Sequence, residues 1–453
     1  MSAKVAVISL GCAKNLVDSE IMLGGLRKEG YAIVETPEDA DVLIINTCSF
    51  INDAKKESIE TIQAASAARR GGRRQRLIVS GCLAQRYRKE LPGLMPEVDS
   101  FIGLDQVAQA GTIVREMLSK SGEAGTPPRS IVSEKSLYIP DYATPRVRLT
   151  PKHTAYVKIA EGCNHTCSFC AIPRIRGRHR SRGIADIARE VASLVKNGCR
   201  EINLVSQDST YFGMDKWLGE RPRPTSKVDS SRGESLASLL RQLNKIPGEF
   251  WIRPLYTHPA HWSRELMESW AECEKVVKCV DVPLQHVSDP MLKAMRRETD
   301  KAHLVNLVKD LRAAIPGLMI RSTFIVGFPG ETQTDFDELM AFVGKAGIER
   351  GGVFEYSREE DTRAYELTEQ IHPATKRKRR NLLTETLYNC AQKRGEGLVG
   401  KRLRVLVEAR GVARTQWDAP EVDGTVEVSK SLRVGDFAEV TITDALGYQL
   451  FSE

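Results

Sequence analysis

The 453-residue sequence predicts an α/β protein built from a parallel α/β sheet domain, a partial barrel of six β/α units and a small C-terminal β-barrel. Apolar runs of strand length alternate with helix-like stretches up to about residue 380, which is the pattern of parallel β/α units. Short alternating strands with glycine-containing turns follow, as in a small β-barrel. The predicted domains cover 1–116, 149–380 and 381–453, with a linker at 117–148.

Three apolar runs supply the strands of the first domain. Buried parallel strands have this composition, and each run is followed by a stretch with helical period. The segment 120–150 shows no steady period and predicts a linker. We predict strands at 4–10, 40–47 and 76–81, and helices at 17–29, 53–68 and 83–91.

Six further apolar runs continue the alternation in the middle of the chain. In a barrel of parallel β/α units, the chemistry takes place at the carboxyl ends of the strands. The segment 215–235 interrupts the second unit and predicts an exposed insertion, while 380–396 predicts a helix before the β-barrel. The predicted strands are 154–160, 201–206, 249–255, 276–282, 318–327 and 352–357, then 403–409, 422–428 and 437–445, with helices at 183–197, 235–245 and 301–314.

The net charge of +7 is modest, but basic residues gather in three runs at 69–76, 174–182 and 376–380. Such runs suit an anionic partner such as RNA or a ribosomal surface, and they equally suit solvated faces. No charged start precedes a long apolar stretch, and no 18-residue apolar run occurs, which predicts a cytoplasmic protein without a membrane segment. In that reducing compartment the ten cysteines favour metal binding or catalysis over disulfides.

The segment "EGCNHTCSFC" places Cys163, Cys167 and Cys170 at the end of the first barrel strand. A structural zinc site needs four protein ligands, and neither His165 nor His179 completes that spacing. Three thiolates in a tight loop suit a [4Fe–4S] cluster with one iron open to another ligand. Zinc binding or plain packing is the alternative.

This loop resembles that of the radical S-adenosylmethionine (SAM) enzymes. The resemblance implies that SAM binds the open iron and is cleaved to methionine and a 5′-deoxyadenosyl radical. It also implies that Phe169, before the last cysteine, packs near the adenine. The stretch "FIVGFPGET" (324–332), with Gly327 and Gly330, resembles the segment of that family that contacts the adenosine of SAM.

Three polar residues are further candidates for SAM binding. They lie at the ends of predicted strands, or on the strand that leads to the site, where a barrel of this kind binds its ligands. A purely structural role is the alternative for each of them. These candidates are Gln207, Gln285 and Arg321.

Three other cysteines each follow one of the apolar runs of the first domain. Cys12, Cys48 and Cys82 are 36 and 34 residues apart, so no local motif groups them. Consecutive parallel strands bring their carboxyl ends to one edge of a sheet, where ligands bind. A lone cysteine at such a place is ordinary packing, but three at equivalent positions predict a second [4Fe–4S] cluster with an open iron. We expect the remaining cysteines to be packing residues: Cys199, Cys273, Cys279 and Cys390.

This combination of parts resembles the methylthiotransferases of the radical SAM group, over essentially the whole chain. The resemblance implies an N-terminal domain with three dispersed cysteines, a radical SAM core and a C-terminal TRAM domain that helps to recognise the substrate. It implies two [4Fe–4S] clusters and two SAM-dependent steps. One SAM methylates sulfur at the second cluster, and another supplies the radical that activates a substrate C–H bond.

Two branches of this family differ in substrate. One modifies adenosine in tRNA, and the other modifies the β-carbon of an aspartate in the twelfth protein of the small ribosomal subunit. The sequence resembles the second branch, because Ala13-Lys14-Asn15 stands where the tRNA branch has Gln-Met-Asn, and His286-Val287 stands where that branch has Ser-Gly. The stretches that carry the resemblance are 9–20, 161–182, 283–297, 321–332 and 418–426.

The C-terminal domain has a slight acidic excess between Arg404 and Thr443, which suits a basic ribosomal protein better than RNA. One departure from the family is Asp361, which replaces a usual glycine and puts the local loop geometry in question. The acidic residues of 357–361 or an arginine of 174–180 could orient the substrate carboxylate, for which arginine is chemically suited.

The expected partners are the small-subunit ribosomal protein or the small ribosomal subunit, and a reductant such as flavodoxin or ferredoxin, with the enzyme a monomer. Two other functions stay open from the sequence. One is a tRNA adenosine methylthiotransferase. The other is a non-catalytic Fe–S ribosome-assembly factor, in which the SAM segment would be vestigial.

Overall fold

The computed structural model describes residues 3–69, 75–119, 129–219 and 222–453. The chain forms two compact units. The first contains Met1–Pro151, Ala160–Asn164 and Cys170–Arg182, and the second contains Lys152–Ile159, His165–Phe169 and Gly183–Glu453. Parts of three predicted features lie outside the described residues, namely 70–74 of a basic run, 120–128 of the linker and 220–221 of the insertion.

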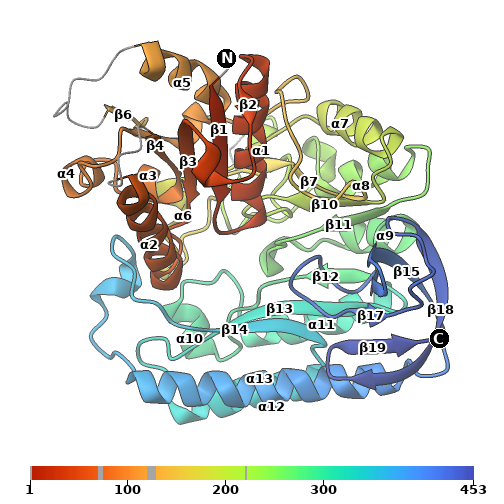
Figure 1. Ribbon diagram of the computed structural model, residues 1–453. Helices are drawn as coiled ribbons and strands as arrows, with labels where there is room; N and C mark the ends of the chain where they lie inside the picture. The colour runs from red at the N-terminus through yellow and green to blue at the C-terminus, as the bar shows by residue number, and fades with distance from the viewer. Residues whose placement is uncertain (1–2, 70–74, 120–128, 220–221) are drawn as a thin grey trace. The chain divides into compact units, whose positions relative to one another are not determined.

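Six parallel strands form the sheet of the first unit, in the order β2-β1-β3-β4-β5-β6 (Figure 1). The central strands β3 and β4 are buried along nearly their whole length, which explains their continuous apolar composition. The three strands predicted for this domain are confirmed. The strands are β1 (Lys4–Ser9), β2 (Ala32–Ile33), β3 (Val42–Thr47), β4 (Arg76–Gly81), β5 (Ser100–Ile102) and β6 (Arg129–Ile131).

The helices of this unit depart from the prediction at two points. The helix expected at 17–29 begins earlier, at Ala13, because Cys12 occupies its N-cap. The helix expected at 83–91 is split in two, and Pro92 lies in the first turn of the second piece. The helices are α1 (Ala13–Lys28), α2 (Asn52–Arg69), α3 (Cys82–Arg86), α4 (Leu91–Leu94), α5 (Ala110–Ser119) and the short α6 (Ile172–Ile175).

Three short strands were not predicted from the sequence patterns. β2, β5 and β6 are two or three residues long, too short to show a period. β6 lies in the segment 120–150, which was expected to be a plain linker and instead pairs with β5. A further antiparallel pair, β8 (Ala160–Glu161) with β9 (Arg180–Ser181), also belongs to this unit.

The second unit contains the partial barrel. Two three-stranded parallel sheets, β7-β10-β11 and β12-β13-β14, are joined by a parallel bridge between Ile252 and Val276. The strands therefore follow in chain order, and the six predicted strands are confirmed. They are β7 (Thr154–Lys158), β10 (Glu201–Val205), β11 (Trp251–Pro254), β12 (Cys279–Asp281), β13 (Met319–Val326) and β14 (Arg350–Glu355).

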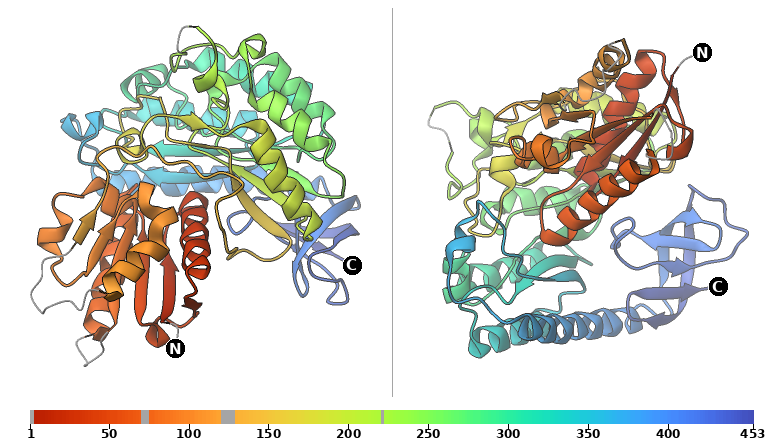
Figure 2. Two further views of the ribbon diagram at one scale, coloured as in Figure 1. Left: turned by 90° about the horizontal axis from the view of Figure 1, so that it is seen from above. Right: turned by 60° about the vertical axis from the view of Figure 1, so that its left-hand side comes forward.

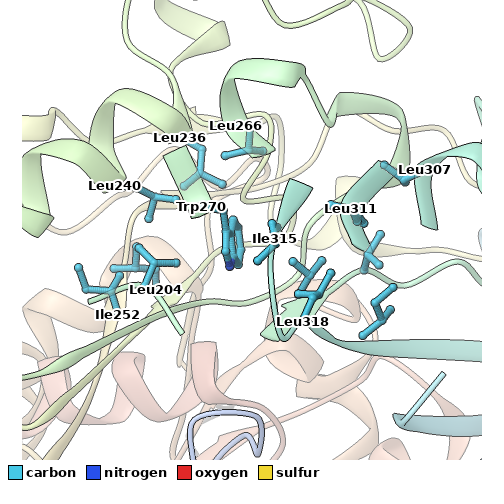
Figure 3. Close-up of a cluster of buried hydrophobic side chains, with 14 of the residues drawn as sticks. Leu204, Leu236, Leu240, Ile252, Leu266, Trp270, Leu307, Leu311, Ile315 and Leu318 are labelled. Carbon is cyan, nitrogen blue, oxygen red and sulfur yellow. The ribbon is translucent and has the colours of Figure 1, made fainter. Parts of the chain in front are cut away.

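Helices that pack on these strands bury a large apolar core. Trp270 lies at the centre of the part drawn in Figure 3, among leucine and isoleucine side chains from strands and helices. Several of the helices have an N-cap side chain that accepts a backbone N–H, such as Ser235, Ser263, Asp300 and Thr332. The helices are α7 (Ile184–Lys196), α8 (Leu236–Asn244), α9 (Arg264–Glu272), α10 (Asp289–Ala294), α11 (Lys301–Ala314) and α12 (Gln333–Ala346).

The 24-residue helix α13 (Pro373–Glu396) packs along α12 and leads into the C-terminal barrel (Figure 2, right). Its buried residues recur every fourth position, which forms one contact stripe. The β-barrel is closed, in the order β15-β16-β17-β19-β18, as predicted for this region. Its strands are β15 (Arg402–Ala409), β16 (Val412–Thr415), β17 (Val426–Glu427), β18 (Phe437–Leu446) and β19 (Gln449–Ser452).

Three of the four cysteines predicted to be packing residues are buried, and Cys390 is half-buried on α13. The insertion 215–235 is exposed only in part. Trp217 is buried against Tyr211 and Met214, whereas the next side chain, Leu218, is exposed. No helix among the described residues has the length and apolar character to cross a membrane.

Candidate functional site

The first unit carries three cysteines at one edge of its sheet. Cys48 directly follows β3, Cys82 directly follows β4, and Cys12 lies three residues beyond β1. These strands are neighbours and run in the same direction. The order 2-1-3-4-5 is that of doubly wound sheets, in which ligands bind beyond the carboxyl ends, where the strand order reverses. The tertiary structure therefore brings the three cysteines to the expected ligand edge.

The backbone before Cys12 lies directly against Cys48. Gly11 has φ +87, and a Cβ at this position would lie 2.7 Å from Cβ and 3.0 Å from Sγ of Cys48. Asn15 ties the two strand ends together, since its Nδ2 donates to the carbonyls of Leu10 at 3.1 Å and Thr47 at 2.8 Å. This edge is therefore closely packed and leaves no space for a side chain at Gly11.

Arg176 is the cation of this site. It is 1% exposed, and its Nη2 donates to the sulfur of Cys82 at 3.4 Å and to Oδ1 of Asn15 at 2.6 Å. Two carboxylates neutralise it, Glu161 at 2.8 Å and Asp18 at 3.1 Å. Arg176 was one of the arginines expected to orient a substrate carboxylate. In the structure its guanidinium instead donates to a thiol and two carboxylates of the first unit.

Burial and charge act on the three thiols in opposite directions. Burial raises the pKa of Cys82 to about 12 and also raises the pKa of Cys48. Burial raises the pKa of Cys12 too, but Lys14, Arg176 and backbone N–H groups outweigh it, so that pKa lies below its ordinary value. A metal ligand must be a thiolate, and Arg176 supplies positive charge to all three sulfurs.

The CxxxCxxC loop is fastened to its surroundings on both sides. In the first unit, the backbone N–H of Cys163 donates to the carbonyl of Gly177 at 3.1 Å. In the second unit, Ser168 donates through its N–H to Met295 at 2.9 Å and through its hydroxyl to Ala294 at 2.8 Å. The loop backbone is therefore held by hydrogen bonds next to its cysteines.

Phe169 packs in an apolar pocket of the second unit. It packs against a buried cluster that contains Met291, Met295, Phe328 and Tyr356. Phe328 belongs to the glycine-rich stretch after β13, so the aromatic residue of the cysteine loop and this stretch share one cluster. The sequence expected both to lie beside SAM, and the structure places them next to each other.

The glycine-rich stretch forms a tight turn that a buried carboxylate holds by hydrogen bonds. Gly327 and Gly330 have φ +69 and +81, the left-handed region that glycine favours. The buried carboxylate of Glu331 accepts from the N–H of Gly327 at 2.6 Å and from Nη1 of Arg379 at 2.5 Å. Its other oxygen lies 3.2 Å from Nε2 of His286, so the histidine that distinguishes the sequence from the tRNA branch helps to hold this turn.

Gln285 continues the barrel edge next to the same turn. Its N–H donates to Thr323 at 2.9 Å, and its carbonyl accepts from Ile325 at 2.8 Å, which forms a bridge beside the end of β13. Its φ of +71 is uncommon for a residue other than glycine and clusters at functional sites. Gln207, two residues beyond the end of β10, is half-buried.

Arg321 does not join this group. It is the third residue of β13, so it lies near the start of the strand, whereas Gly327 follows its end. Its Nη1 donates to Asp281 at 3.0 Å and its Nε to Asp423 at 3.1 Å, and these carboxylates raise its pKa against the opposing effect of burial. These contacts speak against the expected SAM contact of Arg321, because its guanidinium instead holds the C-terminal barrel to the core.

A buried histidine network that no local sequence pattern indicated includes His165 of the cysteine loop. Nε2 of His165 lies 2.8 Å from Asp208, and its Nδ1 lies 3.0 Å from Glu298. Burial lowers the pKa of His165, but these two hydrogen bonds outweigh it and raise the pKa to about 10. His165 appeared in the sequence only as an incomplete zinc ligand, and nothing local pointed to partners 43 and 133 residues away.

His165, His258 and His261 are a group of three imidazoles with nitrogens within 4.8 Å of one another, as found among the described residues. The rings of His165 and His258 stack at 3.7 Å and 16°. A metal ion lies near the plane of each imidazole that binds it, and two stacked rings cannot share one ion in that way. Hydrogen bonds to carboxylates hold His165 and His261, and Nδ1 of His258 accepts from the N–H of Ala260.

Asp361, which replaces a usual glycine, has φ +62. The position therefore keeps the left-handed backbone that glycine favours, and aspartate tolerates this region better than most other residues. The loop geometry that the substitution put in question is thus retained.

The acidic excess of the C-terminal barrel does not reach its surface. Asp418 pairs with Arg350, Asp423 with Arg321, and Glu408 with the buried Arg414. Apart from these paired carboxylates and Arg414, the charged side chains between Arg404 and Thr443 are exposed or half-exposed and balance in sign, so this surface favours neither a basic nor an acidic partner. They are Glu421, Glu427, Asp436 and Glu439, against Arg404, Arg410, Lys430 and Arg433.

Three family models match the chain. Residues 4–103 match the uncharacterized protein family UPF0004, residues 157–343 match the radical SAM superfamily, and residues 399–453 match the TRAM domain. The match over the barrel and its cysteine loop defines the class as the radical SAM enzymes.

Curated relatives resemble the chain over its whole length. It is 54% identical to the ribosomal protein uS12 methylthiotransferase RimO of Akkermansia muciniphila, over 100% of both chains. It is 53% identical to the protein of the same name from Opitutus terrae, over 99% of this chain and 96% of the relative. The chain belongs to the RimO family of radical SAM methylthiotransferases. This membership confirms the predicted enzyme class and its cofactors, SAM and [4Fe–4S] clusters.

Solved structures share the fold at low identity. The radical SAM methyltransferase TsrM from Kitasatospora setae has a TM-score of 0.55 and 13% identity, over 96% of this chain and 84% of that chain. The cobalamin-dependent SAM radical enzyme OxsB has a TM-score of 0.52 and 12% identity, over 86% of this chain and 58% of that chain. At these identities the likeness shows the fold alone.

Proposed function

We propose that this chain attaches a methylthio group to the β-carbon of an aspartate in ribosomal protein uS12. The observation that carries the proposal is the convergence of Cys12, Cys48 and Cys82 on the ligand edge of a parallel sheet. A second three-thiolate site, in addition to the radical SAM loop, suits a reaction that also transfers sulfur. The names of the curated relatives support uS12 as the substrate.

Six cysteines are proposed as ligands of two clusters. Cys163, Cys167 and Cys170 would hold the core cluster, and Cys12, Cys48 and Cys82 would hold the N-terminal cluster. The donor sets fit, because three thiolates leave one iron of a [4Fe–4S] cluster open. The proposed domain limits are 1–116, 149–380 and 381–453, with the linker at 117–148.

SAM contacts are proposed for residues that line the carboxyl ends of the barrel strands. Phe169 would pack on the adenine, and the turn of Gly327 and Gly330 would let the backbone approach the adenosine. Gln207 and Gln285 would add polar contacts, whereas Arg321 is left out because Asp281 and Asp423 hold it.

The reaction needs a cofactor because the aspartate β-C–H bond is unactivated, and side-chain acids and bases do not break such bonds readily. SAM at the core cluster would supply the radical chemistry, and the N-terminal cluster would hold the methylthio group that is transferred. The protein orients these groups and shields them from water. Arg174 and Arg178 are the exposed arginines of the run 174–180, which makes them the candidates for the substrate carboxylate.

Iron and sulfide analysis after anaerobic reconstitution tests the two-cluster part. We expect about eight irons per chain, because each [4Fe–4S] cluster holds four, and about four after Cys12, Cys48 and Cys82 are replaced by alanine. A content of about four in the unchanged chain would overturn the second cluster. Chromatography of the SAM products tests the two steps, since S-adenosylhomocysteine and 5′-deoxyadenosine should form together.

Mass spectrometry of uS12 from cells with and without the gene tests the substrate. The aspartate should carry a methylthio group only when the gene is present. If uS12 is unchanged while a tRNA adenosine loses its methylthio group, the enzyme belongs to the tRNA-modifying type. We further propose that a small electron-transfer protein such as flavodoxin or ferredoxin reduces the core cluster, and that the enzyme is a monomer.

A further inference from the structure

Two consecutive residues after α10 hold the cysteine loop from one side. Nη1 of Arg297 donates to the sulfur of Cys167 at 3.5 Å. Glu298, the next residue, accepts from Nδ1 of His165 at 3.0 Å, two residues before that cysteine. All of these residues belong to the second unit. The pair therefore contacts both the proposed ligand and the loop segment that presents it.

The backbone around Arg297 is built to keep this contact. Arg296 adopts φ +55, a strained conformation for a residue other than glycine, and it ends the helical turn so that the next two side chains face the loop. Nη2 of Arg297 donates to the carbonyl of Pro283 at 3.0 Å, which fixes the guanidinium. Ser168 of the cysteine loop donates hydrogen bonds to the carbonyls of Ala294 and Met295, which holds this segment against the loop.

His165 anchors the loop against this support. Both of its ring nitrogens face carboxylates, which accept hydrogen bonds and donate none, so the ring bridges Asp208 and Glu298. Asp208 in turn lies 3.2 Å from Nδ1 of His261. The loop is thus tied to the segments after β10, β11 and α10, and Cys167 has little freedom to move away from Arg297.

We infer that Arg297 tunes the core cluster through its hydrogen bond to the sulfur of Cys167, and that Glu298 and His165 position the loop for this contact. The inference rests on the proposed ligand role of Cys163, Cys167 and Cys170. Hydrogen bonds to the sulfurs and nearby charge set the reduction potential of such clusters. A cation beside the thiolate favours the more negative, reduced cluster, so Arg297 raises the potential and makes the cluster easier to reduce.

The test measures the reduction potential of the core cluster alone. The full-length chain carries Cys12→Ala, Cys48→Ala and Cys82→Ala, is reconstituted anaerobically, and is titrated without SAM while the reduced cluster is followed by electron paramagnetic resonance. Arg297→Gln should leave about tenfold less reduced cluster at a fixed potential, equal to about 59 mV for one electron. Lys293→Gln is the matched control, because this exposed residue of α10 has the same charge and should leave the potential unchanged.

The outcomes separate this inference from the proposed function. If the chain with Arg297 intact binds no iron, the proposed ligand set fails. If Arg297→Gln holds a full cluster at the potential of Lys293→Gln, the tuning role is overturned. Arg297→Lys covers the case in which Arg297→Gln loses iron. If the lysine variant retains iron, or if iron is lost while the unfolding midpoint is unchanged, the role of Arg297 at the cluster is supported. If iron is lost together with unfolding, that role is overturned in favour of a structural one.

Discussion

Arg176 donates a hydrogen bond to the sulfur of Cys82 over 3.4 Å, and both side chains are buried in the first unit. The two residues are 94 positions apart in the sequence. Arg176 belongs to a basic run that looks like a surface feature, yet its guanidinium lies among the N-terminal cysteines and two carboxylates.

Arg176→Gln should strongly destabilise the first unit. The change leaves Glu161 and Asp18 buried without their cation, which costs about 3–5 kcal/mol in the free energy of unfolding. Urea unfolding of the cluster-free protein measures this loss. The matched control is Arg178→Gln, an exposed arginine two residues away, which should change the free energy by no more than about 0.5 kcal/mol. Equal effects of the two variants would contradict the assignment.

Gly11→Ala should disturb the N-terminal cluster more than its backbone strain alone explains. The new Cβ would lie 2.7 Å from Cβ of Cys48, so the cysteine must move. Gly30→Ala is the control, because Gly30 has nearly the same φ, +86, and nothing within 4 Å of the added atom. Both variants should lose about 1–2 kcal/mol to the left-handed backbone.

Iron content distinguishes the two glycine variants. In a chain that lacks Cys163, Cys167 and Cys170, Gly11→Ala should hold clearly less iron than Gly30→Ala after reconstitution. Equal iron content would show that the close approach of Gly11 to Cys48 has no part in forming the N-terminal site.

Asp361 should tolerate glycine and asparagine but not alanine. At φ +62, alanine lacks the short polar side chain that makes the left-handed region accessible, and the expected loss is about 1–2 kcal/mol. Asp361→Gly and Asp361→Asn should stay close to the unchanged chain. Thermal unfolding of the three variants measures this order. If Asp361→Gly loses as much stability as Asp361→Ala, the aspartate carboxylate and not the backbone conformation stabilises the loop.

Glu201 should contribute to acid sensitivity. It is fully buried; burial raises its pKa, but Arg414 and Arg253 outweigh this and hold the pKa below its usual value. A lowered folded pKa gives stability that is present above the unfolded pKa of about 4.3 and is lost as the pH falls below it. Urea unfolding between pH 6 and pH 3 should therefore show a shallower pH dependence for Glu201→Gln than for the unchanged chain.

The same variant should already be weaker at neutral pH, by about 3–5 kcal/mol, because two buried guanidinium groups lose their shared partner. Glu427→Gln, an exposed position on the C-terminal barrel, is the control and should leave both quantities unchanged. A pH dependence that stays as steep in Glu201→Gln would assign the acid sensitivity to other carboxylates.

The long buried strands and the cysteine positions could be predicted from the sequence. β3 and β4 are buried on both faces, so their apolar runs are visible without any structure. The short strands β2, β5 and β6 were missed because two or three residues carry no period. Phe169 packs against the same apolar cluster as Phe328 of the glycine-rich turn, and its contact with SAM stays a prediction from the resemblance. The contacts of Arg321 could not be predicted, since a strand position does not say which carboxylates lie nearby.

The sequence by itself determined the order of the β/α units, the six cysteines at strand or loop ends, and the class of chemistry that three-thiolate sites support. Only the tertiary structure decided which charges meet these cysteines. Arg176 reaches Asn15 across 161 residues, and Arg297 reaches Cys167 across 130. Local patterns report burial and period, because these depend on neighbours along the chain. Pairing between a cation and a thiol depends on packing between distant segments, and no local pattern encodes it.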